Sequence, residues 1–130
     1  MLSIVLNTKN DTKFKFSKNL VEKTILNTLK SQDIQGIFEI ELKLVSKNGI
    51  QKLNREYRHK DTPTDVLSFP IHEKIEKINQ NPVLLGDIVV CPAVIRKNAL
   101  EFNNTVDKEF LKMIDHSVLH LVGIHHEGDE

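Results

Sequence analysis

The segment at residues 38–45 constrains the fold more than any other part of this sequence. Apolar side chains alternate there with mostly charged ones, as Phe38, Ile40, Leu42 and Leu44 against Glu39, Glu41, Lys43 and Val45. A period of two is typical of a strand with one buried and one polar face. The chain must therefore build a sheet whose apolar face is covered by other elements.

Further strands and amphipathic helices are predicted on both sides of this segment. Strands are expected at 3–7, 66–69 and 84–91, the last of which is apolar enough to be buried on both faces. Apolar spacings of three and four residues predict helices over 17–31, 50–58, 93–102 and 105–122. Residues 71–83 are polar and are expected to form an exposed excursion. This order predicts an α+β fold, in which helices pack on a mixed sheet of about four strands.

The composition fits a single small domain spanning residues 1–130. Of the 130 residues, 39% are hydrophobic and 28% are charged, and 18 basic residues balance 18 acidic ones. Zero net charge argues against whole-surface attraction to nucleic acid, although it leaves room for a local basic patch. Cys91 is the single cysteine, and the apolar runs are shorter than the ~18–20 residues that span a membrane, so we expect a cytoplasmic protein.

Histidines gather near the end of the chain at a spacing that fits a metal site. His116 and His120 are four residues apart, so both lie on one face of the predicted helix and can reach one ion. Gly123 allows a turn with positive φ, after which His126 can return to the same ion. Three imidazoles leave a fourth position open, which is typical of a catalytic zinc site, although nitrogen ligands also bind Ni, Cu and Fe.

Two other interpretations of these histidines compete with a catalytic metal. An isolated pair four residues apart is more often structural or exposed, but four of the six histidines lie within residues 116–126. The spacing also equals that of the metzincin proteases, whose glutamate general base follows the first histidine. Ser117 stands there in this chain and the downstream Met-turn is missing, so we do not expect proteolysis of this type.

The histidine segment and a central segment together resemble the YbeY-type rRNA maturation endoribonuclease family. The first is similar to the family's His-Gly-x-Leu-His-Leu-x-Gly-Tyr-Asp-His motif, and residues 53–70, LNREYRHKDTPTDVLSFP, resemble its central motif almost throughout. Residues 85–88, LGDI, are similar to its later strand. The resemblance covers the chain from Leu53 to its end.

This resemblance implies a small α+β fold with one zinc ion, Zn2+, held by His116, His120 and His126 at the C-terminal helix. It implies a single-strand-specific endoribonuclease that acts in maturation of the 16S rRNA 3′ end and in ribosome quality control. The implied partners are single-stranded rRNA, the small ribosomal subunit and its assembly factors, with no membrane.

The resemblance also gives roles to basic residues of the central segment. Arg58 matches the arginine of the family's motif and would act with His116 in catalysis, while Arg55, Arg58 and Lys60 would bind the RNA. A guanidinium suits this task because it contacts phosphate through two donors and stabilises charge in the transition state. Without the motif, a solvated helix end would be the favoured interpretation of residues 55–60.

Two departures from the family's motif leave alternatives open. Ser117 replaces a glycine, and His125 replaces the aspartate before the last histidine. His125 is therefore an alternative ligand to His126, although the alignment of the motif favours His126. Two other functions also stay open: a zinc-dependent hydrolase of another phosphoester or small substrate, and a non-catalytic ribosome-associated factor whose zinc is structural.

Overall fold

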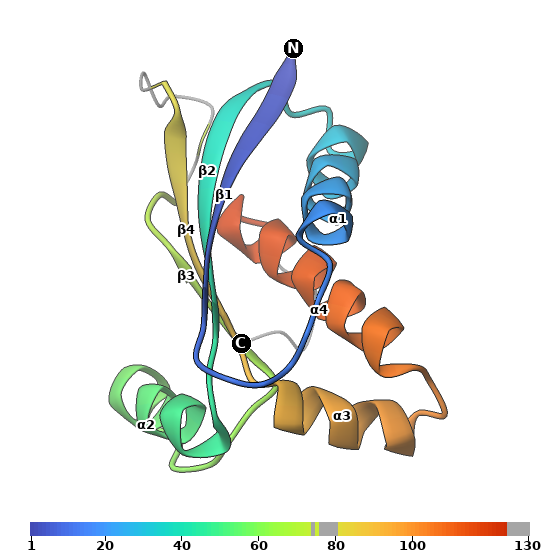
Figure 1. Ribbon diagram of the computed structural model, residues 1–130. Coiled ribbons are helices and arrows are strands. Elements are labelled where there is room, and N and C mark those ends of the chain that lie inside the picture. The colour runs from blue at the N-terminus through green and yellow to red at the C-terminus, as the bar shows by residue number, and fades with distance from the viewer. Residues whose placement is uncertain (74, 76–80, 125–130) are drawn as a thin grey trace.

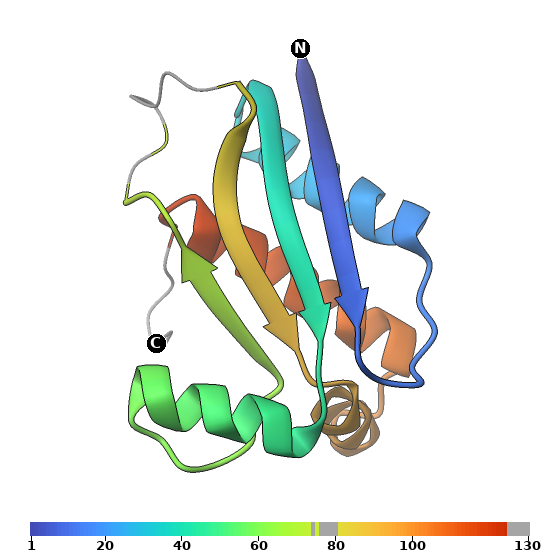
Figure 2. The same cartoon turned by 60° about the vertical axis from the view of Figure 1, so that its left-hand side comes forward.

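Over the described residues 1–73, 75 and 81–124, the computed structural model contains one sheet of four strands (Figure 1). The strands β1 (Leu2–Asn10), β2 (Gly36–Leu44) and β4 (Val83–Val90) run parallel, and β3 (Val66–Pro70) pairs antiparallel with β4. Figure 2 shows the resulting order, β1-β2-β4-β3. The predicted α+β fold with a mixed sheet is confirmed.

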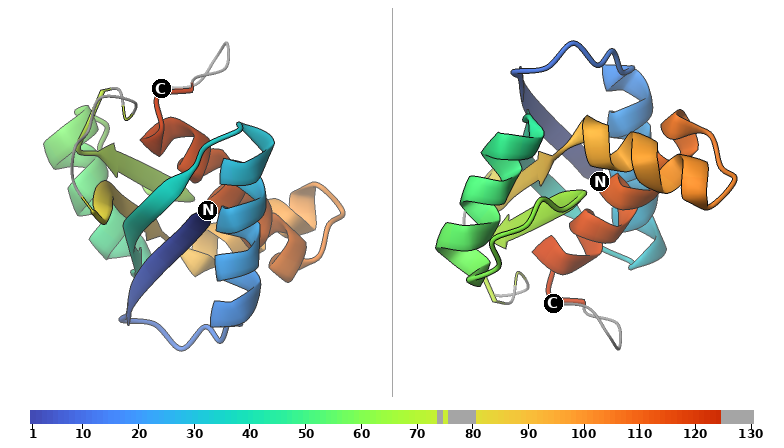
Figure 3. Two further views of the ribbon diagram at one scale, coloured as in Figure 1. Left: turned by 90° about the horizontal axis from the view of Figure 1, so that it is seen from above. Right: turned by 90° about the horizontal axis from the view of Figure 1, so that it is seen from below.

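Helices cover the two faces of this sheet unequally. The helices α1 (Lys18–Ser31) and α4 (Val106–Leu121) pack together on one face, and α2 (Lys47–Arg58) lies on the other (Figure 3). The helix α3 (Pro92–Glu101) packs against α4 at the lower end of the sheet in Figure 1. None of the helices in the described part of the chain has both the length and the apolar composition that crossing a bilayer requires.

The alternating segment behaves as its pattern predicts. Its four apolar side chains are at most 4% exposed and form part of the main core beneath α1 and α4. On the opposite face, the Asn7 Nδ2 of β1 donates hydrogen bonds to Glu39 Oε2 at 2.7 Å and to Glu41 Oε1 at 3.1 Å. A second, smaller core lies under α2, where Ile50 packs with Leu67 and other residues of β3 and β4.

Side-chain caps decide where three of the helices begin. Hydroxyl oxygens accept backbone N–H groups at the first turns: Ser17 from Leu20, Ser46 from Gly49 and Thr105 from Lys108. The helix α2 therefore starts at Lys47 rather than at the predicted residue 50, because Ser46 caps a turn that carries no apolar residue for periodicity to detect.

The prediction that residues 71–83 form an exposed excursion is wrong at two of the described positions. Val83 is 7% exposed and opens β4, where it pairs with Phe38 of β2. Ile75 packs against the main core. Apolar residues spaced along a polar segment give no periodic signal, so their burial depends on long-range pairing that the local pattern does not contain. Residues 74 and 76–80 lie outside the described part of the chain.

Ser117 is a polar residue on the buried face of α4. It is fully buried, and its Oγ has no hydrogen-bond partner within the described residues. We expect Ser117→Ala to raise the free energy of unfolding by about 1 kcal/mol, because it removes an unpaired buried hydroxyl and favours the helix. Urea denaturation measures this change. Ser17→Ala is the matched control and should lower stability by about 1 kcal/mol, because it removes a cap; equal signs for the two variants would contradict the account.

Candidate active site

A cavity of about 490 Å³ lies between α4 and the loop that joins α2 to β3. Three parts of the chain line this cavity. They are the loop and strand residues 62–68, the residues Asn54 and Arg58 of α2 with Lys60 just after it, and Met113, His116 and His120 of α4. The predicted catalytic arginine and two predicted metal ligands, far apart in the sequence, therefore meet in one cavity. The antiparallel strand β3 contacts both α2 and α4 and so links the two walls of the cavity.

The two histidines of α4 are arranged as the four-residue spacing predicts. The imidazole centroids of His116 and His120 are 4.5 Å apart, with the ring planes at 60°. Both side chains are partly exposed on the cavity wall. Two imidazoles this close can share one zinc ion, which takes nitrogen ligands at about 2.0–2.1 Å. The donor chemistry of this wall therefore fits zinc.

The third predicted ligand cannot be placed. His126 and its alternative His125 lie outside the described residues. Within the part of the chain that the structure describes, no three histidine, cysteine, aspartate or glutamate side chains gather closely enough to hold a metal. The predicted set of three ligands thus stays a prediction, of which two members share one cavity wall.

Gly123 turns the chain at the end of α4. Its φ is +87°, its N–H donates to the His120 carbonyl at 3.0 Å, and the Ile124 N–H donates to the Leu119 carbonyl at 2.9 Å. These two bonds are those of a Schellman motif, which ends a helix and redirects the chain. The predicted glycine turn after His120 is confirmed.

We expect Gly123→Ala to lower the free energy of unfolding by about 1–2 kcal/mol, because alanine is strained at this φ. A Cβ there would also lie 2.9 Å from the backbone oxygen of Glu73. Thermal denaturation measures the loss, and zinc affinity should fall in parallel because the turn leads to His126, the predicted third ligand. Unchanged stability and unchanged zinc affinity would show that the turn does not position the following segment.

Arg58 reaches the cavity from the last turn of α2. Its Nη2 donates to the Ser68 carbonyl of β3 at 3.3 Å. The next residue, His59, has a φ of +58° and ends the helix in the left-handed conformation. One bond to a carbonyl uses one of the five guanidinium N–H donors. The bond to β3 thus orients the guanidinium at the cavity wall and leaves it donors for a phosphate.

Lys60 and Arg55, the other basic residues predicted to bind RNA, lie in different places. Lys60 lines the cavity together with Arg58. Arg55 lies outside the cavity wall, and its Nη1 forms an ion pair with Asp61 Oδ1 at 3.2 Å. Hydrogen bonds from Gln51 and then from Arg55 hold the pKa of the Asp61 carboxyl below its usual value. The positive charge beside the histidines therefore comes from Arg58 and Lys60, and RNA binding by Arg55 stays a prediction.

Asn54 was not predicted as part of the site, although it holds one of the cavity walls. It is 4% exposed, its Nδ2 donates to the Thr62 carbonyl at 2.9 Å, and its own carbonyl accepts the Lys60 N–H at 3.3 Å. The sequence carries one signal for this role, since Asn54 follows Ile50 by four residues on the buried stripe of α2, where an apolar residue is usual.

Asp65 is the one carboxylate that lines the cavity among the described residues. It accepts the Val66 N–H at 2.8 Å, the Thr64 hydroxyl at 3.3 Å and the Asn98 Nδ2 of α3 at 3.4 Å. Its oxygens are thus engaged in holding the loop. Asp65 joins this wall of the cavity to α3.

Comparison with known proteins finds a matching family model, similar sequences and a similar solved structure. The family model described as "Endoribonuclease YbeY" matches residues 4–130. A relative of that name from Thermotoga neapolitana is 40% identical over 113 residues, covering 87% of this chain and 68% of the relative. Another, from Clostridioides difficile, is 35% identical over 133 residues, covering 99% and 86%. A solution structure of a Thermotoga maritima protein, 32% identical, superposes with a TM-score of 0.60 and covers 97% of this chain and 77% of its own.

Proposed function

Because the chain belongs to the endoribonuclease YbeY family, we propose that it is a zinc-dependent endoribonuclease specific for single-stranded RNA. The observation that carries this proposal is the meeting of Arg58 with His116 and His120 in one cavity. The catalytic residues are Arg58 and His116, the metal ligands are His116, His120 and His126, and one zinc ion is bound.

The proposed roles follow from the chemistry of these side chains. When bound, zinc supplies a Lewis acid for a phosphoryl oxygen and lowers the pKa of water. The Arg58 guanidinium binds the scissile phosphate and stabilises the charge that grows on its oxygens. Lys60 in the cavity wall and Arg55 outside it attract the flanking RNA backbone.

In the cell, we propose that the substrate is rRNA, at the 3′ end of 16S rRNA and during ribosome quality control in the cytoplasm. A chain with 18 basic and 18 acidic residues does not attract nucleic acid over its whole surface. Binding to the small ribosomal subunit and its assembly factors would bring the cavity to its substrate. The local positive charge of Arg58 and Lys60 is then enough to hold the strand at the site.

A substrate panel tests the proposed activity. Single-stranded RNA, an RNA hairpin, single-stranded DNA and a small phosphodiester are each incubated with wild type and with His116→Ala. We expect wild type to cleave single-stranded RNA preferentially and the variant to lose that cleavage.

Preference for the small phosphodiester would instead indicate a hydrolase of another phosphoester. If no substrate is cleaved while His120→Ala lowers the Tm and weakens binding to small ribosomal subunits, the zinc is structural and the proposed activity is wrong. Equal cleavage by wild type and His116→Ala would identify a contaminating nuclease.

A further inference from the structure

Phe102 is a large aromatic side chain that the fold leaves in solvent. It ends α3, is 64% exposed and takes no part in the main core. The Lys112 ammonium of α4 lies over its ring, 5.9 Å from the ring centroid. An exposed ring held beside a cation combines the two groups that bind single-stranded nucleic acid, a stacking surface for a base and a positive charge for a phosphate.

The helix α4 places Lys112 one turn from the wall of the cavity. Lys112 precedes His116 by four residues, so the two side chains lie on the same side of α4 and about 6 Å apart along its axis. His116 belongs to the cavity wall. The cation therefore lies one helical turn from a predicted metal ligand.

Phe102 is connected to the cavity through the end of α3. Asn98 precedes Phe102 by four residues, and the Phe102 N–H donates to its carbonyl at 2.9 Å. The side chain of Asn98 donates to Asp65 Oδ2, and Asp65 lines the cavity. Lys112 is thus one turn from His116, which lines the cavity. Phe102 is one turn from Asn98, which holds the cavity residue Asp65.

We propose that Phe102 and Lys112 form a nucleotide subsite beside the cavity, where a base of the single-stranded RNA stacks on Phe102 and an adjacent phosphate pairs with Lys112. This subsite rests on the proposed function, because its ligand is the strand that enters the cavity. It binds any base, since stacking does not read sequence. It selects unpaired RNA, because a base within a duplex has no free face to offer the ring.

Stacking is tested with short single-stranded RNAs that carry the fluorescent base 2-aminopurine at successive positions. We expect wild type to quench the probe at one or two positions. Phe102→Ala should abolish this quenching and weaken binding about tenfold, whereas Phe102→Tyr should retain both. Leu100→Ala is the matched control, because Leu100 is an 83% exposed apolar residue of the same helix, and it should behave as wild type. Equal binding and quenching by Phe102→Ala and wild type would overturn the subsite.

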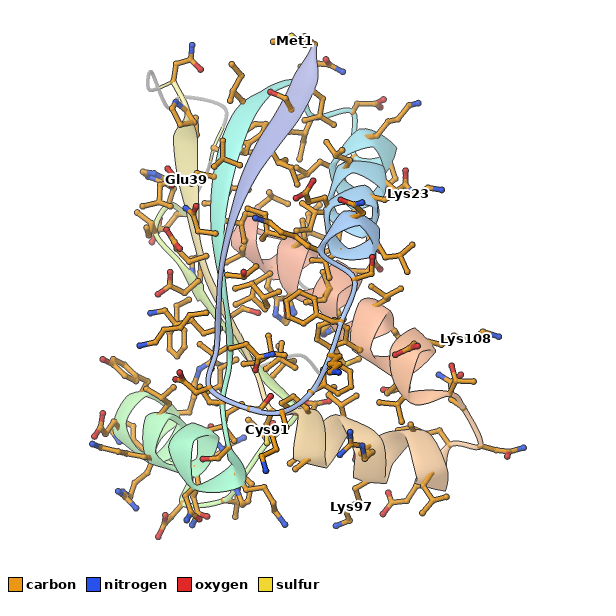
Figure 4. The ribbon with its side chains drawn as sticks, in the orientation of Figure 1. Met1, Lys23, Glu39, Cys91, Lys97 and Lys108 are labelled. Carbon is orange, nitrogen blue, oxygen red and sulfur yellow. The ribbon has the colours of Figure 1, made fainter. Side chains whose placement is uncertain are left out.

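The phosphate contact is tested by salt dependence. Lys112→Ala should reduce the slope of log affinity against log salt concentration by about 0.7, the value for one phosphate on a single strand, while Phe102→Ala should leave the slope unchanged. Lys23→Ala is the control, since Lys23 is an exposed lysine of α1 whose side chain points away from the fold (Figure 4). An unchanged slope in Lys112→Ala would exclude the contact.

These measurements separate the subsite from the proposed function. Binding and quenching need no cleavage, so an inactive protein that still quenches the probe through Phe102 would retain the subsite and lose the proposed activity. A protein that cleaves RNA equally well with and without Phe102 would retain the activity and lose the subsite. If Phe102→Ala weakens binding to a ribosomal protein but not to RNA, the exposed ring is a protein contact and the RNA subsite is wrong.

Discussion

Replacing Arg58 with alanine is expected to lower kcat/KM for single-stranded RNA by about 10²–10³-fold, the usual effect of removing one group that stabilises transition-state charge. Arg58 is partly buried in the cavity wall, and its guanidinium is oriented by its bond to the Ser68 carbonyl. A lysine lacks the planar fork of donors, so Arg58→Lys should restore little of the activity. Steady-state cleavage of a labelled oligonucleotide measures both variants.

Arg55→Ala is the comparison for Arg58→Ala, because Arg55 is proposed to attract the flanking RNA from outside the cavity without touching the scissile phosphate. Arg55 is three residues away on the same helix, but its guanidinium pairs with Asp61 on the exposed side. Loss of an exposed ion pair changes stability by about 0–1 kcal/mol, and we expect activity to fall less than about threefold. Both variants should keep the zinc content and Tm of wild type within a few degrees. Equal losses of activity in the two variants would contradict the special role of Arg58.

Replacing Gly86 with alanine should cost about 3–4 kcal/mol of unfolding free energy, from strain at positive φ together with overpacking. The φ of Gly86 is +143°, and an added Cβ would lie 2.2 Å from the Phe69 backbone oxygen and 3.1 Å from Leu121 Cδ2. Relief requires β3 or the end of α4 to move, and these elements carry Ser68 and His120. Activity and stability should therefore fall together.

Gly49→Ala controls for the loss of glycine itself. Gly49 lies in the first turn of α2, where a Cβ would come within 3.3 Å of Val45 Cβ without a positive φ. The gain in helix propensity and this close contact oppose each other, so we expect a change within about 1 kcal/mol. Chemical denaturation compares the two variants. A Gly86→Ala protein as stable as Gly49→Ala would show that β3 and β4 can separate at no cost.

Local signals in the sequence were enough to predict that the helices α1 to α4 form and that His116 and His120 lie together. The apolar spacings identify α1 and α4, which Ser17 and Thr105 cap, and the four-residue spacing puts His116 and His120 on one face. Each of these features depends on neighbours within one or two helical turns. Propensity and geometry over that range are properties of the local sequence.

Features that depend on long-range pairing were not predictable in the same way. Nothing local to β2 indicates that it pairs with β4 rather than with β3, or that Val83 would enter that sheet. The cavity likewise exists because β3 runs antiparallel to β4 and brings residues 62–68 toward α4. Arg58 lines the cavity and Arg55 does not. Arg55 pairs instead with Asp61, whose position depends on how the loop folds back. Of the basic cluster, the motif identified Arg58, and the fold places it in the cavity.

Zinc titration into metal-free protein tests the central claim most directly. The account predicts that chelation abolishes cleavage of single-stranded RNA, and that activity returns in proportion to added zinc and saturates at one ion per chain. His120→Ala, which removes one of the two predicted ligands on α4, should bind zinc more weakly and recover no activity. Full cleavage by the metal-free protein, with no response to zinc, would contradict the account.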